Sequence, residues 1–318
     1  MPSIAPTLAE PAAKVRRKSV WNEIKKNRYS YLFILPGMIF LFVFMYYPMY
    51  GVTLAFKEYM INKGIMHSPW VGFRNFSTLQ EDPLFWDAFW NTFRMGFWYI
   101  ATGFPATIIL ALLINELGAR RYKRLLQTIY TFPNFLSWVI VAGVMLNFLS
   151  TEGVINQILH LFGSPGYEFL ADSSLTRPLM YITSIWKGAG WGAIIYLAAI
   201  AGINPEQYEV AEIDGANRYQ KMWYITWPGI KSTAVILLIL AFGGIMNGAF
   251  DQILNLTNPI TQDAAEVLDT YIYRVTFNSS IFDYGFSTAM GLFKSAINFI
   301  FLILANKIAK MLGEGGIM

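Results

Sequence analysis

The chain has 318 residues, of which 55% are hydrophobic and only 14% are charged, and its formal net charge is +4. An ordinary soluble domain carries roughly a quarter charged residues, so this composition excludes a typical soluble enzyme or binding domain. The absence of cysteine excludes disulfide frameworks, thiolate metal sites and cysteine nucleophiles, and the two histidines give little basis for a metal centre.

The first 28 residues are polar and basic, and we expect them to form a cytoplasmic tail. The apolar run that follows, residues 29–56, is longer than the core of a signal peptide and lacks a small-residue cleavage site. We therefore expect it to remain attached as the first membrane span of a transmembrane domain that covers residues 29–318.

Several apolar runs of about 20 residues carry almost no charge, which is the pattern of membrane-spanning helices. The sequence predicts an all-α membrane protein with about six such helices, at residues 29–56, 89–116, 127–149, 178–203, 231–257 and 285–312. Glycines in the fourth and fifth spans are expected to let helix backbones approach closely; they are Gly188, Gly190, Gly192, Gly243, Gly244 and Gly248.

Lysine and arginine are distributed unevenly between the two sides of these spans. Of the 24, 16 fall on the side of the N-terminal tail, five on the opposite side and three inside spans. Because cytoplasmic segments of membrane proteins are enriched in lysine and arginine, we expect both termini to lie in the cytoplasm.

The cytoplasmic segment between the fourth and fifth spans, residues about 204–230, has the pattern of two short helices joined by a turn. Pro205 is suited to the first turn of a helix, and Glu206, Glu209 and Glu212 favour the N-terminal half of one. Gly215 can adopt the left-handed conformation that ends a helix. A compact charged hairpin beneath the bilayer is suited to docking on a cytoplasmic protein, whereas the alternative, a solvated loop with helical propensity, does not explain the ordered spacing.

The run E-V-A-E-I-D-G-A at residues 209–216, followed by Trp223, Ile225 and Trp227-Pro228, resembles the EAA motif of binding-protein-dependent ABC importer permeases. The family pattern is E-A-A-x-x-D-G-A with a phenylalanine, an isoleucine and L-P at the later offsets. Val210 replaces an alanine of that pattern, and Ser232 stands where many members have a second proline. The substitutions keep the apolar character of the motif.

This resemblance implies a type I ABC importer permease fold in the bacterial cytoplasmic (inner) membrane. It implies a second permease subunit, two cytoplasmic ATP-binding subunits and an extracytoplasmic solute-binding protein as partners, besides membrane lipid, and no nucleic acid. ATP and Mg would be bound by the ATP-binding subunits, and no cofactor by this chain, which has no P-loop pattern. The residues implied to couple to the ATPase are Glu209, Ala211, Asp214, Gly215, Ala216 and Arg218.

Three further stretches, residues 46–57, 71–76 and 133–138, resemble the first permease of polysaccharide-type carbohydrate importers. The chain is similar to the first permease subunit of alginate oligosaccharide importers. The resemblance therefore implies transport of oligosaccharides, including acidic ones such as alginate oligomers, and a non-catalytic role for this subunit.

Four charged residues lie in the outer halves of the predicted spans: Arg94, Lys187, Asp251 and Lys294. Charged groups at membrane depth are costly unless they face a partner or a wet cavity, so each is a candidate for the substrate pathway. Counted from the outer ends of the predicted spans, they occupy similar depths, which predicts one polar site. Three further pathway residues stand four positions from a charged one and should share its helix face: Trp191 with Lys187, Asn247 with Asp251 and Asn298 with Lys294. Trp186 is suited to stacking on a sugar ring.

Three cations against one carboxylate favour an anionic solute, such as a uronic acid oligomer. The structural alternative is that Asp251 neutralises one lysine while the other cations extend to the outer headgroups. Two other function classes are open from the residues alone. An ion-coupled secondary sugar transporter should show a pair of interrupted, symmetry-related helices, and a membrane-embedded glycosyltransferase should show clustered carboxylates or metal ligands.

Overall fold

The computed structural model describes residues 25–118, 120–277 and 283–313, and its chain divides into two units, residues 1–53 and 54–318. Within the described residues, six helices are long and apolar enough to cross a membrane. They are Arg28–Phe56, Pro83–Asn115, Trp138–Leu161, Ser173–Ala201, Arg218–Gly243 and Tyr284–Met311. The all-α, six-span prediction is therefore confirmed, although two of the spans differ from the predicted ones. The basic side chains of residues 14–18 lie outside the described residues.

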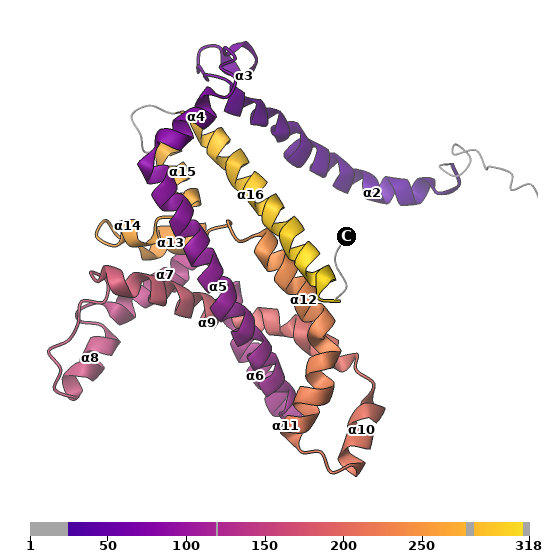
Figure 1. Ribbon diagram of the computed structural model, residues 1–318. Helices are drawn as coiled ribbons and strands as arrows, with labels where there is room; N and C mark the ends of the chain where they lie inside the picture. The colour runs from indigo at the N-terminus through magenta and orange to yellow at the C-terminus, as the bar shows by residue number, and fades with distance from the viewer. Residues whose placement is uncertain (1–24, 119, 278–282, 314–318) are drawn as a thin grey trace, which may run out of the picture. The chain divides into compact units, whose positions relative to one another are not determined.

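The described part of the first unit is one apolar helical segment. It begins with α2 (Arg28–Leu41), passes through a short π-helical turn, η1 (Phe42–Tyr46), and enters the 3₁₀ segment η2 (Tyr47–Phe56). Its side chains up to Tyr50 are exposed, as expected for a helix whose surroundings are lipid or another subunit. Figure 1 labels this segment and the elements of the second unit.

Three spans of the second unit begin at an aspartate. Asp82, Asp172 and Asp283 are the N-caps of α5 (Pro83–Asn115), α9 (Ser173–Ala201) and α16 (Tyr284–Met311), and each carboxylate accepts a backbone N–H of the first turn. These bonds satisfy donors that the helix itself leaves free. The helices α5 and α9 consequently start about five residues before the predicted spans. Two short helices, α3 (Gly64–His67) and α4 (Arg74–Glu81), precede α5.

The predicted third span, 127–149, is wrong as a continuous helix. Its residues belong to α6 (Arg120–Thr131), the 3₁₀ turn η3 (Phe132–Phe135) and α7 (Trp138–Leu149). Pro133 has no N–H to continue α6, and Ser137 caps α7 by accepting the N–H of Ile140, so the chain restarts. After α7 comes α8 (Val154–Leu161), and together they form the span Trp138–Leu161.

The predicted fifth span, 231–257, is also wrong. The helix begins earlier, because α11 (Arg218–Lys221), the π-helical turn η4 (Met222–Thr226) and α12 (Trp227–Gly243) follow one another without interruption. It ends earlier as well, since residues 244–249 are not helical and α13 (Phe250–Leu256) is separate. Consecutive glycines at 243 and 244 weaken the helix where it stops. The chain continues through α14 (Gln262–Ala265) and α15 (Leu268–Phe277) to α16.

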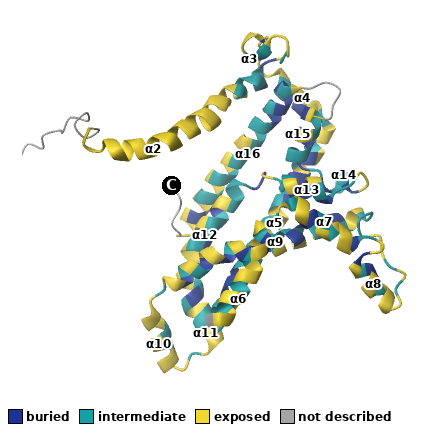
Figure 2. Cartoon of the chain, turned by 180° about the vertical axis from the view of Figure 1, so that it is seen from behind, coloured by how far each residue is buried: buried dark blue, intermediate teal, exposed yellow. Residues whose placement is uncertain are grey.

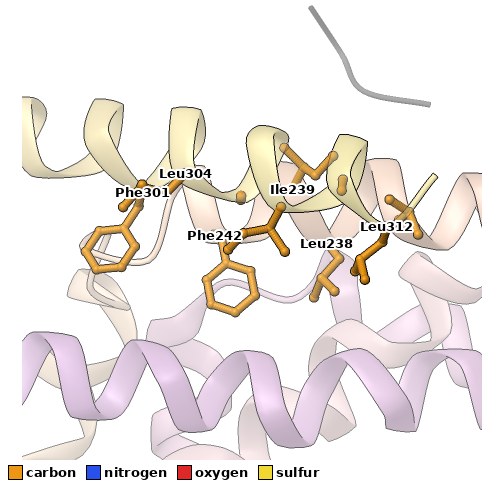
Figure 3. A pocket seen from close by; sticks show the side chains of 10 residues that line it. Leu238, Ile239, Phe242, Phe301, Leu304 and Leu312 are labelled. Carbon is orange, nitrogen blue, oxygen red and sulfur yellow. The ribbon is translucent and has the colours of Figure 1, made fainter. Parts of the chain in front are cut away.

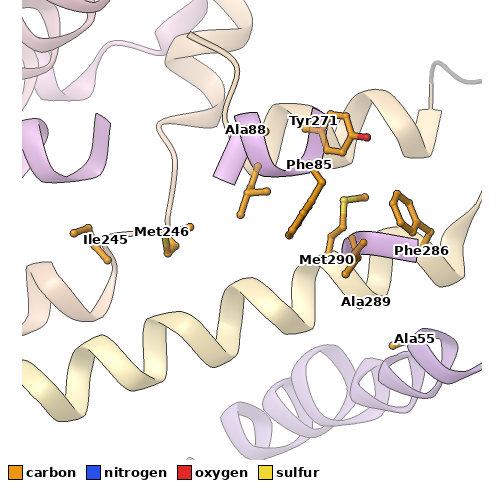
Figure 4. Packing of buried hydrophobic residues seen from close by; sticks show 11 residues of the cluster. Ala55, Phe85, Ala88, Ile245, Met246, Tyr271, Phe286, Ala289 and Met290 are labelled. Carbon is orange, nitrogen blue, oxygen red and sulfur yellow. The ribbon is translucent and has the colours of Figure 1, made fainter. Parts of the chain in front are cut away.

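Among the described residues of the second unit, three clusters of buried apolar side chains hold the helices together. One cluster joins α5, α15 and α16 around Phe85, Tyr271 and Met290 (Figure 4). A second joins α5, α9 and α12 around Ile108, Tyr196 and Ile230, and a third centres on Met180. Figure 2 shows buried segments mixed with intermediate and exposed ones along the long helices of this unit, such as α5 and α9. The exposed apolar faces are available to lipid or to other subunits.

The predicted close approach of helices is confirmed at Gly190, Gly192 and Gly243 and is wrong at Gly188, and Gly96, which was not predicted, also lies at a close contact. A Cβ built on Gly190 of α9 would be 1.9 Å from the carbonyl oxygen of Tyr130 in α6, and one on Gly96 of α5 would be 2.1 Å from the carbonyl oxygen of Ile245. A Cβ on Gly188, by contrast, would meet nothing within 4 Å. The close approach of α9 to α6 therefore depends on Gly190.

We expect Gly190→Ala to lower the thermal stability of the detergent-solubilised protein. The backbone of α6 has to move away from the added methyl, which costs at least about 1–3 kcal/mol, the range for overpacked sites. Gly188→Ala is the matched control in the same helix, and the higher helix propensity of alanine should leave stability unchanged or slightly raised. Equal melting temperatures for the two variants would contradict this packing.

Candidate functional site

The segment between the fourth and fifth spans folds as the predicted helix, turn and helix. The first helix, α10 (Pro205–Ile213), starts at the N-cap Asn204, whose side chain accepts the N–H of Glu206. The turn after α10 contains Gly215, which has φ +77°, and the N–H of Ala216 bonds to the carbonyl oxygen of Ala211 at 2.8 Å. This bond, with that from Gly215 N–H to the carbonyl of Glu212, makes a Schellman motif. Ala211, Gly215 and Ala216 of the EAA-like run thus form the turn at the end of the first helix.

Side-chain contacts fix the second helix against the first. Asn217 and Gln220 form a reciprocal capping box at the start of α11. Lys221 Nζ lies 2.9 Å from Glu212 Oε2, and the hydroxyls of Tyr208 and Thr226 are 2.9 Å apart. We refer to α10 and α11 together as the α10–α11 hairpin; it is joined to α12 without a break.

The outer surface of the α10–α11 hairpin combines acidic and apolar side chains. Glu209, Asp214 and Arg218 are exposed. Ile213 is 86% exposed and Trp223 of the adjoining η4 is 66% exposed. Large exposed apolar side chains beside charged ones are typical of a protein interaction surface. Figure 2 shows α10 as mostly exposed.

Two of the predicted pathway residues stabilise the break between α12 and α13. Lys294 Nζ of α16 lies 2.6 Å from Asp269 Oδ1, and the other oxygen of Asp269 accepts the N–H of Gly248. One turn along α16, Asn298 accepts the N–H of Met246 at 3.0 Å and donates to Asn247 Oδ1 at 3.0 Å. Backbone groups freed by the end of the helix are therefore satisfied by side chains, as the membrane interior demands.

Lys187 has a similar relation to the break between α6 and α7. Its Nζ donates to the carbonyl oxygen of Asn134 at 3.0 Å and lies 5.4 Å from the centre of the Trp138 ring. Trp191, one turn further along α9, packs edge-on against Phe135 with ring centres 5.8 Å apart. A cation and three aromatic rings thus surround this break.

The structure does not bring the four intramembrane ionisable residues together as one site. Lys187 and Lys294 have the different surroundings just described. The expectation that Asn247 and Asp251 share a helical face is wrong, because Asn247 lies in the break and only Asp251 is in α13. The side chains of Arg94 and Asp251 are exposed, and Trp186 is 44% exposed. Within the described residues, the carboxylate that pairs with an intramembrane lysine is Asp269, not Asp251.

A small cavity of about 180 Å³ adjoins the break in the fifth span. It is lined by Gly96, Tyr99, Ile100, Ser184, Ala241, Gly244, Ile245, Asn247 and Ala249. The hydroxyl of Tyr99 donates to Gln252, whose amide in turn donates to Thr183 Oγ1 and to the carbonyl of Met180. Sequence reasoning missed Tyr99, Ser184 and Gln252, because the pathway was predicted from charged residues in the spans. Uncharged polar residues in an apolar run do not stand out by that criterion.

A second cavity, of about 280 Å³, lies between α12 and α16 (Figure 3). Its lining side chains are all apolar and include Phe242, Phe301 and Leu304. A sugar needs hydrogen-bonding groups around its hydroxyls, so this cavity is unsuited to a polar solute.

Comparison with known proteins agrees with this arrangement. Residues 103–313 match the model of the family described as binding-protein-dependent transport system inner membrane component. The chain is similar to the polygalacturonan/rhamnogalacturonan transport system permease protein YteP of Bacillus subtilis (strain 168), with 41% identity over 96% of this chain and 94% of that protein. It is also similar to Protein LplB of the same organism, with 40% identity over 92% of each chain.

Among solved structures, a chain of a bacterial alginate ABC transporter in complex with an alginate pentasaccharide-bound periplasmic protein superposes with a TM-score of 0.84. The two chains are 37% identical, and the match covers 94% of this chain and 99% of that one. The fold is thus that of a type I ABC importer permease, as the EAA-like run implied. The chain therefore belongs to the family of binding-protein-dependent transport system inner membrane components and is a multi-pass permease subunit of the inner membrane.

Proposed function

We propose that this chain is the permease subunit of an ATP-driven importer that moves oligosaccharides, acidic ones included, across the cytoplasmic membrane. The observation that carries the proposal is the α10–α11 hairpin, whose exposed Ile213 and acidic side chains lie at the end of a membrane-spanning helix. This surface would be held by an ATP-binding subunit. Its movement would then be transmitted to the spans as a two-state rearrangement.

The proposed assembly contains two different permeases, two cytoplasmic ATP-binding subunits and an extracytoplasmic solute-binding protein. ATP and Mg would be bound by the ATP-binding subunits, and this chain would hold no cofactor and hydrolyse nothing. The solved relative in complex with a periplasmic protein supports the last of these partners. The excess of lysine and arginine on the side of the hairpin supports a cytoplasmic position for it and for both termini.

The proposed solute path runs past the two helix breaks. Tyr99, Ser184 and Asn247 supply hydrogen-bonding groups at one break, and Trp191 and Phe135 supply ring faces near the other. Hydroxyls and ring faces are what a sugar requires. An acidic solute is supported by relatives whose names specify polygalacturonan and alginate transport. Lys187, Arg94 and Trp186 remain candidates for contact with it.

Crosslinking from the α10–α11 hairpin tests the proposal directly, because the chain has no cysteine of its own. Ile213→Cys, whose parent side chain is 86% exposed, should be captured by a thiol crosslinker on a nucleotide-hydrolysing subunit of the purified complex. Leu161→Cys in α8, 85% exposed, is the matched control and should not be captured on that subunit. Reaction of Ile213→Cys with a membrane-impermeant reagent added outside intact cells would contradict the proposal.

A further inference from the structure

A third cavity, of about 180 Å³, lies in the segment between the fifth and sixth spans. It is formed by α13, α14, α15 and the turn between α13 and α14, and seven of the ten residues that line it have polar side chains. The lining residues are Ile253, Leu254, Thr257, Asn258, Pro259, Gln262, Glu266, Thr270, Tyr273 and Arg274. Its volume is below the roughly 300–1,000 Å³ of sites for drug-sized ligands, so it suits a ligand the size of one sugar ring.

An ion pair stands in the wall of this cavity. The guanidinium of Arg274 lies 2.6 Å from Glu266 Oε2, and it also lies over the Tyr271 ring at 5.6 Å. Burial raises the pKa of Glu266, an effect that Arg274 and Gln262 partly offset. Because the two charges neutralise each other, the cavity is polar without being strongly charged. The guanidinium keeps donors beyond the one engaged by Glu266, since it carries five N–H groups.

An aromatic ring completes the cavity. Tyr273 is 37% exposed, and its ring packs against Phe250 and Phe277 with centres 5.4 and 5.2 Å apart. The ring is therefore held on one side and open on another. Planar donors beside an aromatic ring are the combination that binds the hydroxyls and the apolar face of a sugar.

The cavity walls are fixed to the spans by hydrogen bonds. Asn91 of α5 donates to the carbonyls of Ala264 and Glu266, at 3.3 and 2.7 Å, and Arg177 of α9 donates to the carbonyl of Ala264 at 2.9 Å. Asn258 donates to the carbonyl of Leu170 at 2.7 Å. A preformed site of this kind loses little entropy when it binds a ligand.

We propose that this cavity, which we call the Glu266–Arg274 pocket, binds one pyranose unit of an oligosaccharide before it enters the membrane path. The hydroxyls would bond to Gln262 and Arg274, and the ring would lie against Tyr273. The proposal rests on the proposed function: one span separates the pocket from the α10–α11 hairpin, so a cytoplasmic hairpin places the pocket on the outer side, where the solute arrives. It adds a binding site separate from the helix breaks.

Affinity labelling tests the pocket without any transport. In the assembled transporter, the measured quantity is the rate of labelling by N-bromoacetylglucosamine divided by the rate of labelling by bromoacetamide. This ratio should be at least about fivefold higher for Gln262→Cys than for the control Asp263→Cys, because Asp263 is exposed on the same short helix. The rate should saturate with the concentration of the reagent, and an excess of glucose or glucuronate should slow it. Adding Tyr273→Leu to Gln262→Cys should remove the advantage.

Thr257→Cys, at another position of the lining, provides a second reporter if Gln262→Cys disturbs the loop. Equal rate ratios for the pocket and control cysteines, or a strictly linear concentration dependence, would overturn the proposal. Neither outcome depends on ATP or on import. A transporter that imports oligosaccharides but shows no preference in labelling therefore refutes the pocket alone.

Discussion

Gly215→Val should reduce solute uptake and nucleotide hydrolysis stimulated by the binding protein by more than tenfold. The backbone at Gly215 has φ +77°, a conformation that costs an L-residue about 1–2 kcal/mol and a β-branched one more. No heavy atom lies within 4 Å of the position of its Cβ, so the cost is conformational and not steric. The strain would displace the end of α10, and with it Asp214 and Arg218, from the docking position.

The measurement compares variants at equal amounts of membrane-inserted chain. Gly215→Asn should retain most activity, because asparagine enters the left-handed region more readily than other residues with a side chain. Gly163→Val is the control for strain elsewhere, since Gly163 has φ +79° and equally open surroundings in the loop after α8. If Gly215→Val transports normally, the turn has no part in coupling.

Lys294→Met should destabilise the protein by about 3 kcal/mol, the lower end of the range for breaking a buried ion pair, because this pair is only partly buried. Lys294 and Asp269 are 16% and 23% exposed, and Asp269 also holds the N–H of Gly248 in the helix break. The melting temperature should fall by roughly 10 °C. Lys310→Met, at an exposed position near the end of the same helix, should have no comparable effect.

The double variant Lys294→Met/Asp269→Asn separates a structural role from a role in binding the solute. Asparagine is uncharged, so the double variant leaves no unpaired carboxylate in the helix break. Most of the stability that the single variant loses should therefore return. Uptake should recover with it if Lys294 only holds the break. A single variant with unchanged stability but weaker uptake of an acidic oligosaccharide would instead place Lys294 in contact with the solute.

The features that were predicted correctly depend on residues close together in the chain. The hairpin follows from Pro205, the glutamates of α10 and Gly215, all of which act within one or two turns. The number of spans follows from apolar runs alone. The starts of α5, α9 and α16 could also have been found locally, because Asp82, Asp172 and Asp283 are strong N-caps.

The features that were missed depend on contacts between distant segments. A continuous apolar run gives no sign that Asn298 will supply the bonds that a helix break at residues 244–249 requires. Pro133 could equally have kinked a continuous helix. The break is stabilised by the cap at Ser137 and by the hydrogen bond from Lys187 to the carbonyl oxygen of Asn134. Depth counted along each helix placed the charges at one level, but it could not show that Lys294 faces Asp269.

The segment from Arg218 to Gly243 is helical throughout, with a π-helical turn at Met222–Thr226 and no flexible joint. At 1.5 Å per residue, its 26 residues make a rod of about 39 Å. A torque applied at the end that carries the α10–α11 hairpin would reach the far end with little loss along the way. Deformation would then concentrate where the rod stops, at residues 244–249, so the side chains of α16 that clamp this joint would set how far it yields.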